Sequence, residues 1–238
     1  MLIQDIGDLN NKHLAVDCLG VVLAGGLSSR MGQDKAQLTR SNDTLNKAST
    51  HSWAQTSGQS MLDFSKQLLT DSGIANIVIS GDHHQIPDLV PQSGPVGGIY
   101  SVLAHCLQQY PEHLQPKSFL ILPVDLPLMT PAAIAELRLK GELSRKATFF
   151  SDTQKQIHHI PLYLPNNAFL SAFLSQAFHQ YILVNQDSNR VKGENKNAPS
   201  VRSMLAKIPH QAISSKNSKL LFNTNTPEQW HQAQQQFK

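Results

Sequence analysis

The chain has 238 residues, of which 40% are hydrophobic and 16% are charged, and its net charge is +3. The hydrophobic fraction excludes wholesale disorder, and the charge is too small to indicate a nucleic-acid partner without a clustered basic patch. A domain of this length buries roughly 70% of the surface that its unfolded chain exposes. We expect a single domain over residues 1–238, with an N-terminal extension over residues 1–17.

The N-terminus and the cysteines predict a cytoplasmic protein. Residues 1–17 contain three acids and no apolar core, which excludes a signal peptide, and no run approaches the ~20 apolar residues of a membrane helix. Cys18 and Cys106 are too few for a disulfide framework and lack zinc spacing. Because both lie in apolar stretches, we expect buried free thiols in a reducing compartment, and no membrane partner.

Apolar runs and helical patterns alternate over the first half of the chain. Helical patterns cover residues 61–72, where Gly73 is placed to end the helix, and residues 96–109. Three short apolar runs are typical of buried parallel strands: residues 19–24, 76–80 and 118–124. This order predicts βαβ units, and therefore an α/β fold whose parallel sheet carries helices on both faces.

The pattern is looser in the second half. Thr130 with the proline after it should begin a helix over residues 130–139, and Thr226 should begin the last helix in the same way. Pro161 lies inside a predicted strand, which favours an edge or a bulge for that strand. The other expected elements are helices over residues 166–179 and 200–208 and strands over residues 147–150, 157–164 and 220–222.

Two polar segments have no sustained period. Residues 40–60 are rich in Ser, Thr, Asn and Gln, and predict a surface insertion of the kind that is often disordered. Residues 187–199 are polar as well and predict a loop.

The glycine-rich stretch that follows the first predicted strand is the most informative motif. Residues 23–35, LAGGLSSRMGQDK, include Gly25 and Gly26 and the cations Arg30 and Lys35. Glycine lets backbone N–H groups approach an anion closely, and the cations add charge where phosphates would lie. The stretch matches neither the P-loop nor the dinucleotide fingerprint. It predicts a phosphate-binding loop of another kind, with an ordinary glycine-rich turn and two solvated cations as the alternative.

Asp125 follows the third predicted strand in the sequence PVDLP. An open α/β sheet places its ligand at the carboxyl ends of its strands. A carboxylate there suits Mg²⁺, which prefers oxygen ligands and bridges to substrate phosphates. The alternative is an Asp that caps the turn before the helix at Thr130, but the nearby phosphate-type loop favours the metal.

Two further motifs are weak when taken alone. SGPVGG, residues 93–98, opens a helix with glycines that permit the close approach of a ligand or another backbone. In NTNTPE, Thr226 and Pro227 are explained by their places at the helix start. Asn223 and Asn225 have no such explanation, so they are candidates to supply amide oxygens to a metal or ligand.

Other catalytic classes lack their signatures. The adjacent histidine pairs at residues 83–84 and 158–159 would point to opposite faces of a strand, and no H-E-x-x-H zinc motif occurs. No G-x-S-x-G nucleophile elbow is present. These absences disfavour a histidine metal site and a serine hydrolase.

The motifs LAGG-x-S-x-R-M-G-x-D-K, GP-x-x-G, D-x-P and N-x-NTPE, in this order and at these intervals, resemble the molybdenum cofactor guanylyltransferase family. The resemblance runs from about residue 19 to the C-terminus, apart from the insertion. It implies a three-layer αβα Rossmann-like nucleotidyltransferase fold with a mainly parallel sheet.

The resemblance also implies a reaction. The terminal phosphate of molybdenum-molybdopterin attacks the α-phosphate of GTP, pyrophosphate leaves, and molybdopterin guanine dinucleotide forms; positioning and charge neutralisation dominate such transfers. The implied cofactor is Mg²⁺. Cofactor-delivery proteins and acceptor molybdoenzymes are the implied protein partners.

The roles of individual residues come from the same resemblance. Lys35 would meet the nucleotide phosphates, Arg30 would assist the leaving pyrophosphate, and Asp125 would bind Mg²⁺ in a metal site that Asn225 completes. The residues implied in nucleotide binding are Leu23, Ala24, Gly25, Gly26, Lys35, Ser80, Asp88 and Asp125.

The chain departs from the family pattern in a few places. Val124 stands where the family usually has Cys, and Asp88 aligns only with a one-residue gap. At Ser80 the family often has Asn or Ser. The insertion over residues 40–60 is unusual and lies where it could cover the site.

Three alternatives remain open at the level of sequence. A cytidylyltransferase acting on the same cofactor tends to read LAAG where this chain has LAGG. A sugar-phosphate nucleotidyltransferase is expected to be longer. A non-catalytic nucleotide-binding relative is disfavoured because Arg30, Lys35 and Asp125 are all present.

Overall fold

The computed structural model describes residues 16–25, 31–40, 58–186 and 198–237. Nearly all of the expected N-terminal extension, most of the insertion and most of the predicted loop at 187–199 lie outside the described residues. So do Gly26 and Arg30 of the glycine-rich stretch. The assignment of residues 1–238 to one domain stays a prediction.

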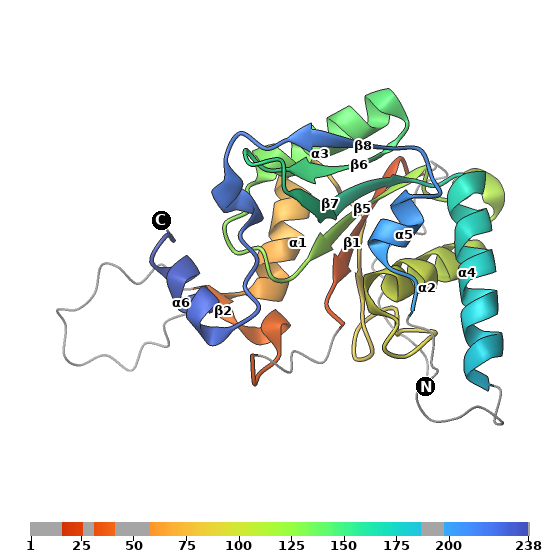
Figure 1. The fold of residues 1–238 in the computed structure, drawn as a ribbon, viewed down its shortest axis with the longest axis horizontal. Helices are drawn as coiled ribbons and strands as arrows, with labels where there is room; N and C mark the ends of the chain where they lie inside the picture. The colour runs from red at the N-terminus through yellow and green to blue at the C-terminus, as the bar shows by residue number, and fades with distance from the viewer. Residues whose placement is uncertain (1–15, 26–30, 41–57, 187–197, 238) are drawn as a thin grey trace.

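A six-stranded sheet of order β4-β1-β5-β7-β6-β8 forms the centre of the described structure (Figure 1). β7 runs antiparallel to both of its neighbours, and every other neighbouring pair is parallel. The strands are β1 (Cys18–Leu23), β4 (Ile77–Ser80), β5 (Ser118–Pro123), β6 (Ala147–Ser151), β7 (Ile157–Pro165) and β8 (His210–Ser214). The predicted mainly parallel sheet is confirmed.

Helices cover both faces of this sheet, which confirms the three-layer α/β architecture (Figure 1). One face carries α1 (Met61–Asp71), α3 (Pro131–Ser144) and α6 (Pro227–Gln234). The other carries α2 (Gly94–Gln109), α4 (Ala168–Gln186) and α5 (Val201–Leu205). Short 3₁₀ helices lie at η2 (Lys35–Gln37), η3 (Glu112–Leu114) and η4 (Ser218–Leu221), and a separate two-stranded ladder joins β2 (Thr39–Arg40) to β3 (Gln59–Ser60).

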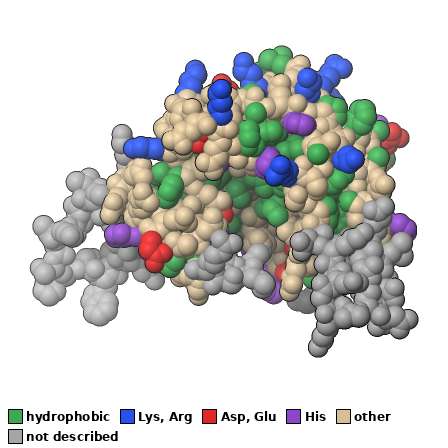
Figure 2. Space-filling view, viewed as in Figure 1, with side chains coloured by type: hydrophobic (Ala, Val, Ile, Leu, Met, Phe, Trp, Pro, Cys, Tyr) green, Lys and Arg blue, Asp and Glu red, His purple; other side chains and the backbone are tan. Residues whose placement is uncertain are grey.

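Successive strand residues divide the core between the two helical layers. In β1, Val22 packs on the side of α1 and α3, whereas Val21 packs on the side of α2. Because helices cover both faces, most residues of β1, β4 and β5 are apolar, which is why these runs show no alternation in sequence. In the space-filling view, hydrophobic side chains gather at the centre of one face, and Lys and Arg side chains stand along its upper edge (Figure 2).

Local signals set the helix boundaries as predicted. The Thr130 hydroxyl accepts a hydrogen bond from the N–H of Ala133 at the start of α3, and the Ser60 hydroxyl caps α1 in the same way. Gly73 follows α1 with a φ of 86°, a left-handed conformation that favours glycine.

Some expectations from the second half are wrong. Residues 220–222 do not form a strand: most of this stretch belongs to η4, and the strand in this region is β8, at residues 210–214. β7 lies between β5 and β6 and is not an edge strand. The expected bulge is present, because the β6–β7 register shifts between Phe149 and Phe150, so Pro161 falls in the irregular stretch where its missing N–H breaks no ladder bond.

Both cysteines are buried and free, as predicted. Burial raises the pKa of Cys18 to about 11 and that of Cys106 to about 12, so both thiols stay protonated near neutral pH. No helix in the described ranges is long and apolar enough to cross a membrane.

The ends of the insertion meet in the β2–β3 ladder, where Arg40 pairs with Gln59 and Thr39 with Ser60. We therefore expect that replacing residues 42–58 with a short Gly-Ser link changes the melting temperature by no more than about 4 °C, because loop-closure entropy changes slowly with loop length. Thermal unfolding of both proteins measures this. As a control, a deletion of residues 39–60 removes the ladder itself and should destabilise the fold.

A link variant that fails to fold would show that residues 42–58 contain a packed element. A folded link variant that has lost activity would instead show that this segment takes part in function.

Candidate active site

The carboxyl ends of three parallel strands lie level at one edge of the sheet. Leu23, the last residue of β1, pairs in register with Ser80 at the end of β4 and with Pro123 at the end of β5. The segments that follow these strands therefore meet at the place where an open α/β sheet binds its ligand. They carry the glycine-rich stretch, Asp88 and Asp125.

Lys35 contacts both Asp125 and Asn225. The Lys35 ammonium donates to Asp125 Oδ2 at 3.1 Å and to Asn225 Oδ1 at 2.5 Å. The side chains of Lys35 and Asp125 are only 16% and 14% exposed, so the ion pair is largely shielded from water. Residues separated by as many as 190 positions along the chain are thus joined at one point.

The backbone at Lys35 is held by its neighbours. Asp34 is the N-cap of η2 and its carboxylate accepts a hydrogen bond from the Ala36 N–H at 2.9 Å. Ala36 has no exposed surface and anchors η2 in the core beneath the site. The cap and the anchor fix the direction of the Lys35 side chain between them.

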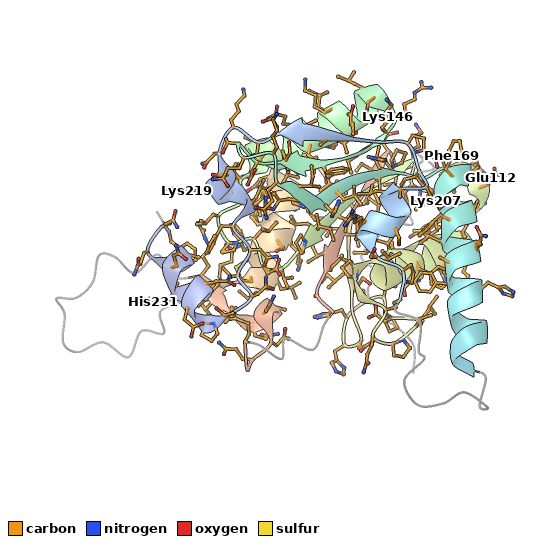
Figure 3. All side chains as sticks on the ribbon, viewed as in Figure 1. Glu112, Lys146, Phe169, Lys207, Lys219 and His231 are labelled. Carbon is orange, nitrogen blue, oxygen red and sulfur yellow. The ribbon has the colours of Figure 1, made fainter. Side chains whose placement is uncertain are left out.

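Asn225 is fixed from two sides. The buried Thr224 donates its backbone N–H (3.0 Å) and its hydroxyl (3.2 Å) to the backbone oxygen of Asp125. On the other side, Gln229 Oε1 accepts from the N–H groups of Asn225 (2.7 Å) and Thr226 (3.1 Å) in a capping box at the start of α6. The segment lies between Lys219 and His231 in the chain, both of which are labelled in Figure 3.

The environment of Asp125 suits a cation. Burial raises the pKa of its carboxyl group, and the Lys35 charge and, more weakly, Asn223 oppose that shift. Its second oxygen, Oδ1, is buried and has no hydrogen-bond partner in the described structure. A carboxylate oxygen in this position is of the type that hard metal ions prefer, and the adjacent Asn225 amide oxygen is of the same type.

The described part of the chain contains no group of three or more His, Cys, Asp or Glu side chains that could hold a metal ion. A metal at Asp125 would therefore have few protein ligands. This is typical of Mg²⁺ sites in which substrate phosphates complete the coordination.

Gly25 and Gly81 bring two strand ends together backbone to backbone. A Cβ built on Gly81 would lie 2.8 Å from the Gly25 nitrogen, so no other residue fits at position 81 without movement. A Cβ built on Gly25 would lie 3.3 Å from Gly81 Cα and 3.5 Å from Asp88 Oδ2. Asp88 therefore lies beside the glycine-rich stretch, as its assignment to nucleotide binding requires, and burial followed by repulsion from Asp82 raises the pKa of its carboxyl group.

Two other predicted nucleotide contacts, Ala24 and Ser80, are bonded into the edge of the sheet. Ala24 donates its N–H to the Ser80 backbone oxygen at 2.9 Å, so the stretch begins as an extension of the sheet. The Ser80 side chain is 1% exposed and its hydroxyl donates to the Gly98 oxygen at 3.4 Å. This packing against α2 gives Ser80 a structural role, and its contact with a nucleotide stays a prediction.

Thr224, Gln229 and Gly81 belong to the site, although sequence reasoning did not single them out. The T-x-x-Q spacing of a capping box was the available signal for Gln229. Gly81 directly follows a predicted strand, which is a weak signal of close backbone approach. Thr224 acts through bonds to the backbone of a distant residue, for which the sequence carries no signal.

The sequence profile of the MobA-like NTP transferase domain matches residues 20–186, which is more than half of the chain. The chain belongs to this family. It is accordingly a nucleotidyltransferase, and the resemblance seen in the sequence motifs is confirmed.

Individual members of the family agree with this assignment. The molybdenum cofactor guanylyltransferase of Xanthomonas euvesicatoria pv. vesicatoria (strain 85-10) is 29% identical over 216 residues, which cover 89% of this chain and 91% of that protein. A probable molybdenum cofactor guanylyltransferase of Flavobacterium johnsoniae is 27% identical over 143 residues, covering 60% of this chain and 61% of its own length.

Solved structures share the fold. Molybdopterin-guanine dinucleotide biosynthesis protein A from Archaeoglobus fulgidus has a TM-score of 0.56 at 16% identity, over 91% of this chain and 97% of its own. A Mycobacterium tuberculosis protein solved as a complex with manganese has a TM-score of 0.51 at 12% identity, over 93% of this chain and 99% of its own. At these identities the likeness shows the fold alone.

We expect Lys35→Ala and Asp125→Asn each to lower nucleotidyl transfer by about 10²–10³-fold, because each removes charge that acts on phosphate. Lys35→Ala should also lower the melting temperature, because it leaves the buried Asp125 carboxylate without its cation, whereas Asp125→Asn should change stability little. Asp125→Asn removes a buried carboxylate whose desolvation is unfavourable, which offsets the loss of its ion pair with Lys35. Pyrophosphate release and melting curves measure the two effects.

The ion pair between Lys117 and Asp17 provides the matched control. It spans 2.7 Å, but its side chains are 69% and 75% exposed, and it lies at the opposite end of β5. Lys117→Ala and Asp17→Asn should leave turnover unchanged. Near-normal turnover in folded Asp125→Asn would remove Asp125 from the catalytic machinery.

Proposed function

We propose that this nucleotidyltransferase transfers GMP from GTP to the terminal phosphate of molybdenum-molybdopterin, giving molybdopterin guanine dinucleotide and pyrophosphate. The observation that carries this proposal is the contact of Lys35 with Asp125 and Asn225 beside the glycine-rich stretch. The family supplies the reaction class, and the names of the curated relatives supply the two substrates.

The transfer forms one bond and breaks another. An oxygen of the terminal phosphate bonds to the α-phosphorus of GTP, and the bond from that phosphorus to the oxygen bridging to the β-phosphate breaks. The electron pair leaves with pyrophosphate. The protein forms no covalent bond in this scheme, so its contribution is to position the two phosphates and to neutralise their charge.

Each site residue has a part in this scheme. Leu23, Ala24 and Gly25 hold the nucleotide through their backbone, and Asp88 contacts it from the adjoining segment. Lys35 donates to its phosphate oxygens. Arg30, which lies outside the described residues, assists the leaving pyrophosphate.

Asp125 and Asn225 would hold a divalent metal ion, for which we propose Mg²⁺. The unpartnered Asp125 Oδ1 fits such an ion, and a structural neighbour was solved with manganese. The metal would neutralise charge on the phosphates during transfer. Before it binds, Lys35 supplies the positive charge that lets the Asp125 carboxylate stay buried.

The test is product identification. The purified chain is incubated with molybdenum-molybdopterin, Mg²⁺ and one of GTP, CTP, ATP or UTP, and the products are separated and identified by mass. Guanine dinucleotide from GTP is the expected product. The cytosine dinucleotide from CTP would instead establish the alternative, a cytidylyltransferase of the same cofactor, and no product with any nucleotide would indicate a binding protein.

Gly25 is the position at which we expect the choice of base to be made. Related cytidylyltransferases carry alanine there, and a purine needs more room than a pyrimidine. The φ of Gly25 is not in the left-handed region, so alanine is compatible with its backbone, and the added methyl would press on Gly81 Cα and lie in contact with Asp88. We expect Gly25→Ala to lower kcat/KM for GTP relative to CTP by roughly tenfold to a few hundredfold.

Gly20→Ala is the control, because it adds the same methyl within β1, the strand before Gly25, but toward Leu69 and Ile74 in the core. It should affect both nucleotides equally. If Gly25→Ala also lowers kcat/KM for GTP and for CTP by the same factor, base selection does not reside at Gly25.

A further inference from the structure

Arg40 lies between two buried phenyl rings. Its guanidinium carbon is 4.6 Å from the ring centroid of Phe64 on α1 and 4.8 Å from that of Phe237, which follows α6. Phe64 is 8% exposed and Phe237 is 6% exposed. The Arg40 Nε is buried and has no hydrogen-bond partner in the described structure, so the rings are the main contacts seen for this cation.

Arg40 and Phe237 belong to different arms of the active site. Arg40 lies five residues after Lys35, in the strand that follows η2. Phe237 lies at the far end of α6, whose first turn fixes Asn225 through Gln229. Figure 1 shows β2 beside α6. The Arg40 contact with Phe237 therefore joins the Lys35 arm to the Asn225 arm away from the reacting groups.

The Arg40–Phe237 contact matters because the hydrogen bond between Lys35 and Asn225 can be lost when substrate binds. The Lys35 ammonium donates to Asn225 Oδ1, and a nucleotide phosphate would compete for the same ammonium. When Lys35 turns to the phosphate, the Thr224 bonds still hold Asn225 to Asp125, and the Arg40 contact with Phe237 still joins the segment after η2 to α6. Phe237 also packs edge-on against Trp230, with 5.8 Å between the ring centroids, so movement of the Phe237 ring would be transmitted along α6.

We propose that Arg40 is a positioning residue for nucleotidyl transfer: its cation, held between Phe64 and Phe237, keeps α6 and Asn225 in register with Lys35 and Asp125. The proposal rests on the proposed function for its kinetic test. Arg40 touches neither substrate nor metal in this scheme, and it acts through Asn225.

A planar cation suits this position better than an apolar side chain. Guanidinium groups stack on aromatic faces and attract the ring electrons, whereas methionine only fills space. Burial lowers the pKa of Arg40, the direction expected for a cation taken partly out of water, but an arginine keeps its proton in proteins. Arg40→Met therefore removes the attraction to the rings while keeping most of the side-chain volume. Arg40→Lys keeps the positive charge but lacks the planar guanidinium group.

The kinetic experiment is a double-mutant cycle of Arg40→Met with Asn225→Ala, measured well below the melting temperature of every variant. We expect Arg40→Met to lower kcat about tenfold with little change in KM for GTP, because misplacing a positioned group costs the chemical step more than binding. Arg40→Lys should lower kcat by a smaller factor. In the Asn225→Ala background, Arg40→Met should have no further effect, since the group that it positions is gone.

Arg138→Met is the matched control. This half-buried arginine on α3 donates to Glu142 and to the Gly73 oxygen, both at 2.8 Å, and contacts neither arm of the site. It should lower the melting temperature without changing kcat. Full kcat in Arg40→Met, or an equal loss in both Asn225 backgrounds, would overturn the proposal and leave Arg40 as a packing residue.

Hydrogen exchange tests the same inference without turnover. In Arg40→Met, amides of residues 225–237 should exchange faster, while amides of α3 keep their wild-type rates. Unchanged exchange over residues 225–237 would overturn the proposal. If the wild-type protein transfers no nucleotide at all, the proposed function fails, and the exchange measurement still decides the role of Arg40.

Discussion

Burial of the Asp125 carboxylate is the constraint on which the site depends. The segment that follows β5 places this group where water hardly reaches it, and this burial raises the pKa of the carboxyl group. A buried carboxylate needs a cation and further hydrogen bonds to remain charged. Lys35 supplies the cation at one oxygen, and the other oxygen has no hydrogen-bond partner among the described residues. The same geometry that is unfavourable for folding thus prepares a ligand for a metal ion.

Keeping that ion pair in place requires connections across the whole chain. η2, β5 and the segment before α6 are far apart in sequence, and backbone bonds from Thr224 to Asp125 join two of them directly. The third, η2, is joined to α6 through Arg40, which follows η2 and contacts Phe64 and Phe237 away from the reacting groups. Each cation–π contact contributes only about 0.5–2 kcal/mol. That is small against the stability of a domain, but it is sufficient to set the population of one loop arrangement over another.

The sequence predicts those parts of the molecule that local chemistry decides. Apolar runs, helical periodicity and the glycine after α1 predicted β1, α1, β4, α2 and β5 to within two residues, and the family resemblance of the motifs assigned Lys35, Asp125 and Asn225 to one site before any geometry was known. Tertiary context decided the rest. β8, whose sequence is HQAIS, has too little apolar character to be recognised as a strand, and only its pairing with β6 makes it one. The sandwich of Arg40 depends on residues 64 and 237, for which position 40 carries no signal.

Backbone packing at the glycine-rich stretch explains why its tolerance to change differs from that of the charged residues. Lys35 and Asp125 interact through side chains, which can adjust by rotation when a ligand arrives. Gly25 and Gly81 meet backbone to backbone, so an added methyl group has no rotamer by which to move away. A Cβ built on Gly25 would press on Gly81 Cα at 3.3 Å and would lie in ordinary contact, at 3.5 Å, with an oxygen of Asp88. A methyl group at position 25 therefore acts on the Gly81 backbone and touches a residue that we assign to the nucleotide site. A single small substitution at this point would for that reason alter the choice of nucleotide before it altered the fold.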